Sequence, residues 1–402
     1  MLCCTDIDRM TDIQLNGKST LDTPSATMSA KEKEAKLKSA DENNKPPNYK
    51  RISDDDLYRH SSQYRMWSYT KDQLQEKRVD TNARAIAYVE ENLLKFREAH
   101  NLTEEEIKVL EAKAIPLTME EELDLVNFYA KKVQVIAQHL NLPTEVVATA
   151  ISFFRRFFLE NSVMQIDPKS IVHTTIFLAC KSENYFISVD SFAQKAKSTR
   201  DSVLKFEFKL LESLKFSLLN HHPYKPLHGF FLDIQNVLYG KVDLNYMGQI
   251  YDRCKKRITA ALLTDVVYFY TPPQITLATL LIEDEALVTR YLETKFPSRE
   301  GSQESVPGNE KEEPQNDAST TEKNKEKSTE SEEYSIDSAK LLTIIRECKS
   351  IIEDCKPPST EEAKKIAAKN YYCQNPSTLI QKLKRKLNGE DTSSTVEKKQ
   401  KT

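Results

Sequence analysis

Glycine is scarce in this sequence: the chain has 7 Gly in 402 residues, and its long periodic segments contain almost none. Folds rich in β-turns need glycine at positions of positive φ, and so do the loops that cradle phosphate groups. Neither Gly-x-Gly-x-x-Gly nor a Walker-type phosphate loop occurs. The composition therefore favours an all-α protein and argues against a nucleotide site.

Metal-binding and catalytic signatures are missing as well. The 7 Cys include no Cys-x-x-Cys pair, which argues against a zinc site and favours free thiols in a reducing compartment. The adjacent His221 and His222 have no carboxylate or Cys at ligand spacing, so we expect a structural role for them. No hydrolase, metalloprotease or kinase signature occurs. We therefore predict no catalytic residue, no metal and no cofactor.

Charge and hydropathy argue against two further classes of protein. Lys and Arg number 58 and Asp and Glu 61, so the composition gives no sign of a nucleic-acid or membrane surface. One apolar run, residues 258–282, approaches the length of a membrane span, but Asp265 lies near its centre and a Pro-Pro pair divides it. We interpret this run as two core helices with a tight connection. The first ten residues are mostly polar, which predicts no signal peptide and leaves Met10 as an alternative start to Met1.

Composition and periodicity divide the chain into segments. They are a disordered tail at 1–50, an N-terminal helical extension at 51–118, a first helical unit at 119–220, a second at 221–296, an acidic disordered linker at 297–335, a C-terminal helical region at 336–388 and a basic tail at 389–402. Thr103 and Glu106 have capping-box spacing at a helix start. Thr23, before a Pro, is a minimal site for Pro-directed phosphorylation. The basic tail fits a nuclear import signal and a solvated helix end equally well.

The two helical units repeat one plan. In the first we expect helices at about residues 119–140, 143–160, 167–183, 189–197 and 202–215. Residues 275–282 of the second unit align with residues 171–178 of the first. In this register Lys181 falls opposite Glu285, so only the first unit has the lysine.

The second helix of the first unit has two different sides in the sequence pattern. Its four Phe between residues 153 and 158 predict core packing between helices. Arg155 and Arg156 lie on the opposite side, which we expect to face water.

Two charged residues stand where the periodicity predicts apolar ones. Lys181 shares a helical stripe with Phe177, and Glu207 shares one with Leu211. Either side chain alone fits the ordinary case in which its apolar CH₂ groups pack against the protein and its charged end reaches water. Together they predict a Lys/Glu pair at the rim of an apolar groove, which is suited to fixing the orientation of a bound helix.

Several motifs, jointly rather than singly, resemble the cyclin H family of fungi, the cyclin subunit of the transcription factor IIH kinase. They run from Ser61 to Trp67 (SSQYRMW), Phe154 to Met164 (FRRFFLENSVM), Phe177 to Lys181 (FLACK), His222 to Pro226 (HPYKP), Gly229 to Asp233 (GFFLD), Leu263 to Asp265 (LTD), Tyr270 to Ile275 (YTPPQI) and Pro357 to Glu362 (PPSTEE). The resemblance covers residues 61–387 apart from the acidic linker. It implies two tandem five-helix cyclin boxes with N- and C-terminal helical extensions.

The resemblance also implies a set of site residues. The family's kinase-binding positions fall on Lys181, Glu207, Leu211, Phe216 and Leu218. Tyr64 and Trp67 of the N-terminal helix are further positions expected to contact the kinase.

One docking site of cell-cycle cyclins is not expected here. Their substrate-docking patch needs apolar residues and a Trp at the start of the first box. This chain has Met119-Glu-Glu-Glu-Leu123 there, with Val126 in place of the Trp. Acidic side chains at these positions spoil an apolar pocket.

The function implied by the resemblance is regulatory rather than enzymatic. A cyclin of this family binds and activates a cyclin-dependent kinase of transcription factor IIH in the nucleus, with a RING-finger assembly subunit and the transcription factor IIH core as partners. The kinase phosphorylates the carboxy-terminal domain of RNA polymerase II. Direct contact with nucleic acid or membrane is not expected. The alternatives are a cyclin of a Mediator or elongation kinase, and a DNA-binding general transcription factor with cyclin-like repeats. That last alternative needs a basic face, which the balanced charge does not indicate.

Overall fold

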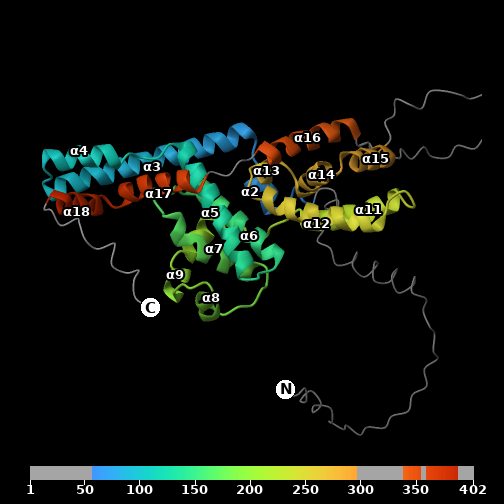
Figure 1. Ribbon diagram of the computed structural model, residues 1–402, viewed down its shortest axis with the longest axis horizontal. Helices are drawn as coiled ribbons and strands as arrows, with labels where there is room; N and C mark the ends of the chain where they lie inside the picture. Colours follow the sequence, from blue (N-terminus) through green and yellow to red (C-terminus); the bar gives the residue numbers. More distant parts are fainter. Residues whose placement is uncertain (1–56, 297–337, 355–358, 388–402) are drawn as a thin grey trace, which may run out of the picture. The chain divides into compact units, whose positions relative to one another are not determined.

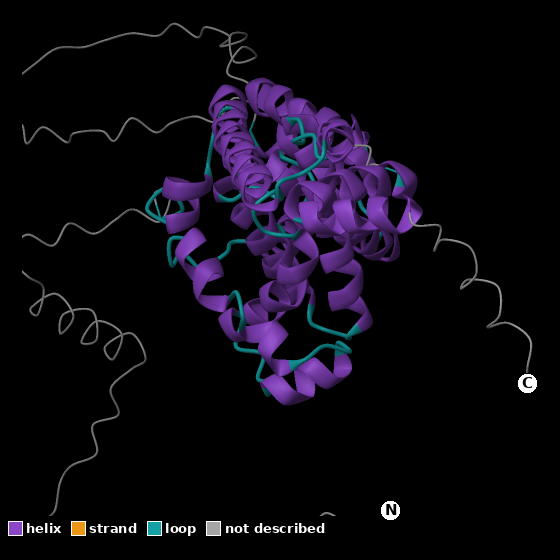
Figure 2. Cartoon of the chain, turned by 90° about the vertical axis from the view of Figure 1, so that its left-hand side faces the viewer, coloured by secondary structure: helices purple, strands orange, loops and turns teal. Residues whose placement is uncertain are grey.

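The computed structural model describes residues 57–296, 338–354 and 359–387, and these residues form helices and loops without a strand (Figure 2). The predicted all-α class is confirmed. The predicted disordered tail and basic tail lie outside the described residues, and so does the acidic linker. Within the described ranges, no helix is long and apolar enough to cross a membrane.

The helices follow one another in four groups along the chain (Figure 1). The N-terminal group is α2 (Ser62–Trp67), α3 (Lys71–His100) and α4 (Glu104–Lys113). The first bundle is α5 (Met119–His139), α6 (Thr144–Glu160), α7 (Pro168–Ser182), α8 (Val189–Lys195), α9 (Arg200–Leu204) and α10 (Glu207–Ser213). The second bundle is α11 (Tyr224–Val237), α12 (Leu244–Ala261), α13 (Val266–Phe269), α14 (Pro272–Glu283) and α15 (Glu285–Lys295). The C-terminal group is α16 (Ser338–Asp354), α17 (Thr360–Gln374) and α18 (Pro376–Leu387).

Side-chain caps fix where several helices begin. Thr103 and Glu106 form the predicted capping box of α4, and the same box, made by Thr118 and Glu121, starts α5. Asp167 accepts a hydrogen bond from the first turn of α7, which has Pro168 at its first position. Local sequence therefore sets the helix starts that orient the first bundle.

The predicted helix over residues 202–215 is wrong in one respect. The chain forms two short helices there, α9 and α10, with a turn at Lys205 and Phe206. Phe206 has φ −105° and ψ 9°, outside the α-helical range, and this interrupts the hydrogen-bond ladder. The turn makes Glu207 the first residue of a new helix. Apolar spacing continues across the turn, so periodicity could not reveal it.

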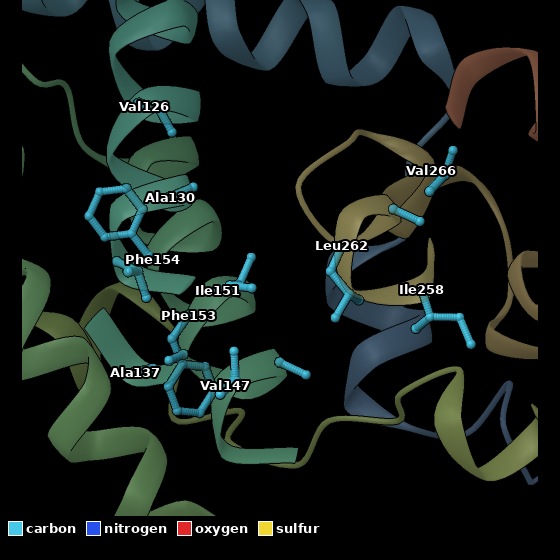
Figure 3. Close-up of a cluster of buried hydrophobic side chains, with 14 of the residues drawn as sticks. Val126, Ala130, Ala137, Val147, Ile151, Phe153, Phe154, Ile258, Leu262 and Val266 are labelled. Atoms are coloured by element: carbon cyan, nitrogen blue, oxygen red, sulfur yellow. The ribbon is translucent and has the colours of Figure 1, made fainter. Parts of the chain in front are cut away.

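Helix α6 is buried on all sides, which corrects a second prediction. Its four Phe are in the core as expected, but Arg155 and Arg156 are each only 4% exposed. The buried cluster in Figure 3 includes Ile151 of α6 together with Ile258 of α12 and Leu262, which follows the last residue of α12. The side of α6 that we expected to face water is covered because α3 packs on it and because Arg155 bonds to the backbone carbonyl of Leu263 and to the carboxylate of Asp265 in the second bundle.

A carboxylate at the start of α13 joins three parts of the chain. Asp265 accepts two hydrogen bonds from Arg78 of α3, at 2.8 and 2.7 Å, and one from Arg155 of α6, at 2.6 Å. Burial acts to raise the pKa of Asp265, but the hydrogen bond from Arg78 and the charge of Arg155 outweigh it, and the pKa is lowered. We call this group the Asp265 network. It ties the N-terminal group and both bundles together.

The C-terminal helices pack in two places. α16 lies against α14, with Leu342 and Ile345 buried, so its apolar face is covered by the chain's own second bundle. α17 and α18 return to α3, α4 and α5 (Figure 1). There Asn370 donates to the backbone carbonyl of Val163 at 2.9 Å. The domain limits drawn from the sequence stay predictions.

Candidate partner-docking site

Lys181 and Glu207 meet where the end of α7 lies beside the start of α10. Their side chains form an ion pair and are 47% and 21% exposed. The ammonium of Lys181 also lies 5.0 Å from the ring centroid of Phe177, so it is held from two directions. Lys has three donors, and a carboxylate has several acceptor positions. The pair therefore keeps hydrogen-bonding capacity on its exposed side.

The segment after α10 is fixed onto α7. Ser182 donates through its hydroxyl to the backbone carbonyl of Leu218 at 3.0 Å. Leu211 and Leu218 are half-buried and pack on the core. Lys215 and Phe216 both have positive φ, 52° and 54°, which is uncommon for residues with a side chain. Such strain persists only where the surroundings hold it, and it is often found at functional sites.

Large apolar side chains are exposed along the same stretch of chain. Phe216 is 64% exposed, as a docking residue should be. Sequence reasoning missed Phe208, Leu219 and Phe186, which are 72%, 65% and 94% exposed. Their only signal is a large apolar residue in a short or irregular segment, and for Phe208 the prediction of one continuous helix over residues 202–215 hid it. Phe208, Phe216 and Leu219 are close together along the chain, and such a group of exposed apolar residues indicates an interaction surface.

In the second bundle, the residue that corresponds to Lys181 contacts another helix of the same chain. Glu285, which aligns with Lys181, pairs with Arg346 at 3.1 Å and with Lys349 at 3.4 Å, both on α16. The two bundles share a helix plan, but the exposed Lys/Glu pair belongs to the first.

The N-terminal helix α2 contributes one accessible candidate rather than two. Tyr64 is 39% exposed, and its predicted contact with a partner stays a prediction. Trp67 is 1% exposed, and the guanidinium of Arg156 and the ammonium of Lys215 lie 5.1 and 5.2 Å from its ring centroid. Because its ring is inside the fold, Trp67 supports the structure and does not present a surface.

The start of α5 is covered by the chain's own α3. Met119, Leu123 and Val126 line a cavity of about 30 Å³ together with Arg78 and Thr81 of α3. Nearby, the amide of Asn82 donates to the carboxylate of Glu122 at 2.7 Å. This packing adds a physical reason, beyond the acidic sequence, to expect no substrate-docking patch here.

The surroundings of His222 and Cys180 fit a structural role. The ring Nε2 of His222 lies 2.7 Å from the hydroxyl of Thr149, and burial lowers the pKa of His222 to about 3. Burial raises the pKa of the Cys180 thiol, next to Lys181, to about 11. The part of the chain that the structure describes holds no group of three or more His, Cys, Asp or Glu placed to bind a metal ion.

Comparison with known proteins matches both bundles to one family. The cyclin N-terminal domain matches residues 97–219, and the cyclin C-terminal domain matches residues 222–353. Cyclin mcs2 of Schizosaccharomyces pombe is 36% identical over 241 residues, which are 60% of this chain and 73% of the relative. The putative cyclin-H of Dictyostelium discoideum is 33% identical over 198 residues, 47% of this chain and 69% of the relative.

Two solved structures extend the likeness. A chain of the yeast TFIIK (Kin28/Ccl1/Tfb3) complex is 76% identical and has a TM-score of 0.54, over 73% of this chain and 100% of that one. A chain of the CAK complex from Chaetomium thermophilum, bound to ATP-gamma-S, is 26% identical and has a TM-score of 0.62, over 88% and 100%. With its tandem cyclin domains and these relatives, the chain belongs to the cyclin H family.

Proposed function

We propose that this chain is a regulatory subunit that binds and activates a cyclin-dependent kinase of transcription factor IIH. The observation that carries the proposal is the exposed Lys181/Glu207 pair beside exposed apolar residues on the first cyclin box. The 76% identical chain belongs to a complex of Kin28, Ccl1 and Tfb3, which supports the same assignment.

The geometry fits the recognition of a helix. Lys181 can donate to backbone carbonyls of a docked segment, and Glu207 can accept from its backbone N–H groups. Phe216 offers apolar area next to these polar contacts. Truncating one member of a polar pair that becomes buried in an interface costs about 2 to 5 kcal/mol. The charged pair would thus fix orientation, and the apolar residues would supply much of the affinity.

Activation follows from holding the kinase in one pose. A protein kinase is active when its αC helix places a glutamate against the lysine that binds the ATP phosphates. A rigid helical platform that binds αC only in that pose shifts the kinase population toward the active state. The Asp265 network contributes by stiffening the platform, because it joins α3, α6 and α13. The cyclin itself supplies no catalytic group to this reaction.

The wider assignments belong to the same proposal. The kinase would phosphorylate the carboxy-terminal domain of RNA polymerase II in the nucleus, within an assembly that includes a RING-finger subunit and the transcription factor IIH core. We propose no direct contact with nucleic acid. Membership of the cyclin H family favours this function over a Mediator or elongation cyclin and over a DNA-binding transcription factor core.

The test is affinity purification of the full chain from nuclear extract, followed by a kinase assay. The substrates are a polymerase carboxy-terminal repeat peptide and a second, unphosphorylated cyclin-dependent kinase. We expect the repeat peptide to be phosphorylated by the purified material. Labelling of the second kinase would add a kinase-activating role. Purification without kinase activity toward the repeat peptide would overturn the proposal.

A further inference from the structure

A small polar cavity lies where the two cyclin boxes and the N-terminal group meet. Its volume is about 30 Å³. Its lining includes Arg156 of α6, Asn220 and His222 of the segment between the boxes, and Tyr268 of α13. Gln63 of α2 also lines it and holds the same segment, since its amide donates to the carbonyl of His221 at 3.2 Å and accepts from the N–H of His221 at 2.7 Å.

Arg156 brings to this cavity a positive charge that no carboxylate of the described residues neutralises, although its guanidinium lies 5.1 Å from the ring centroid of Trp67. Its residue is 4% exposed, its Nη1 makes no hydrogen bond, and among the described residues no carboxylate pairs with it. Arg155 is equally buried but bonds to Asp265 and to the side-chain oxygen of Asn127. Burial lowers the pKa of Arg156 to about 10, so the group keeps its charge at neutral pH. A buried charge normally has a partner, because leaving it alone costs several kcal/mol.

The other groups around the cavity leave the charge unbalanced. The side-chain nitrogen and oxygen of Asn220 are both buried without a hydrogen-bond partner. His222 is neutral, because burial holds its pKa at about 3, and its ring already contacts Thr149. No Asp or Glu is among the residues that line the cavity. The site therefore presents a cation and an amide that can donate, and it needs an acceptor.

We propose that this cavity binds a small monatomic anion of the size of chloride, held by the guanidinium of Arg156 and the side-chain amide of Asn220. The volume admits one or two particles of the size of a water molecule. The amide of Asn220 turns its nitrogen toward the anion, an orientation that the hydrogen-bond network decides. The anion would bridge α6 and the connection between the boxes, and so help to fix their relative position.

Stability of the full chain against chloride concentration tests the site. Sodium chloride replaces sodium gluconate at constant ionic strength, and the unfolding equilibrium is measured at each step. Above the dissociation constant, a tenfold rise in chloride should raise the folding constant of the wild type close to tenfold. Arg156→Met should remove this dependence, and it should still fold because apolar replacement of a buried charge is often tolerated. Arg200→Met, which changes an exposed arginine, should keep the wild-type dependence.

A crystal of the wild-type chain soaked in sodium bromide provides a second measurement that does not depend on any variant folding. We expect an anomalous peak within hydrogen-bond distance of Arg156 and Asn220. Density for water alone, with a folding constant that ignores chloride, would overturn the proposal. An equal chloride response in wild type and Arg156→Met would overturn it too, because it would show a general salt effect.

Discussion

Replacing Asp265 by Asn should destabilise the whole molecule, because the change leaves two buried guanidinium groups without their carboxylate. Arg78 and Arg155 have side chains that are 12% and 3% exposed, and both bond to Asp265. Breaking a buried ion pair by removing one partner costs about 3 to 5 kcal/mol. In a folded body of this size such a loss lowers the thermal midpoint by roughly 10 °C. The matched control is Asp252→Asn, which removes the same charge from an exposed position on α12.

The pH dependence of this loss has a definite sign. The folded-state pKa of Asp265 is lowered below its unfolded value, so the stabilisation is present above about pH 4 and is lost as the pH falls through the lowered pKa. The gap in stability between wild type and Asp265→Asn should therefore be widest at neutral pH and narrow in acid. Denaturant unfolding between pH 3 and pH 8 measures it. If Asp265→Asn behaves like Asp252→Asn, or if the gap widens in acid, the reasoning about the network is wrong.

Three further predictions concern single residues. Burial raises the pKa of Glu122, although hydrogen bonds from Ser162 and Asn82 act to lower it. The contribution of Glu122 to folding stability is therefore complete below about pH 4. It declines as the pH rises through the raised pKa. The stability of wild type relative to Glu122→Gln should thus fall from pH 4 to pH 8 in urea titrations, and a rise would contradict this. Trp67→Ala should cost about 3 to 5 kcal/mol because it empties a fully buried site, and an unchanged melting temperature would show that the ring is not packed as described. Phe216→Ala should weaken kinase binding roughly tenfold while changing stability by less than about 0.5 kcal/mol, because the ring is exposed; unchanged binding would remove Phe216 from the docking site.

The sequence predicts best where the decisive information is local. The positions of Lys181 and Glu207 among apolar neighbours predicted a Lys/Glu pair, and the structure brings the two side chains together. The capping box of Thr103 and Glu106 is formed as expected. In both cases the prediction depends on a few residues of one or two helices, because helix geometry determines where their side chains lie.

Predictions failed where a segment distant in the sequence determines the surroundings of a residue. The arginines of α6 were expected to face water because periodicity shows which residues share a side, but not what covers that side. The sequence indicated Asp265 as a residue that argues against a membrane span and as part of a family motif, yet it did not show that Asp265 is the acceptor for Arg78, 187 residues away. Trp67 was expected at an interface, and it is buried because it packs in a cluster with Leu74, Leu159 and Tyr268. The kinase contacts themselves involve a second chain and stay a prediction.

The most direct test of the account is the affinity between the purified chain and the cyclin-dependent kinase of transcription factor IIH, measured by titration calorimetry. Lys181→Ala and Glu207→Ala should each raise the dissociation constant by roughly 30-fold or more, equal to about 2 kcal/mol or more. Lys209→Ala, an exposed lysine of the same helix α10, is the control and should bind like the wild type. Wild-type affinity in both pair variants would contradict the claim that this face of the first cyclin box holds the kinase.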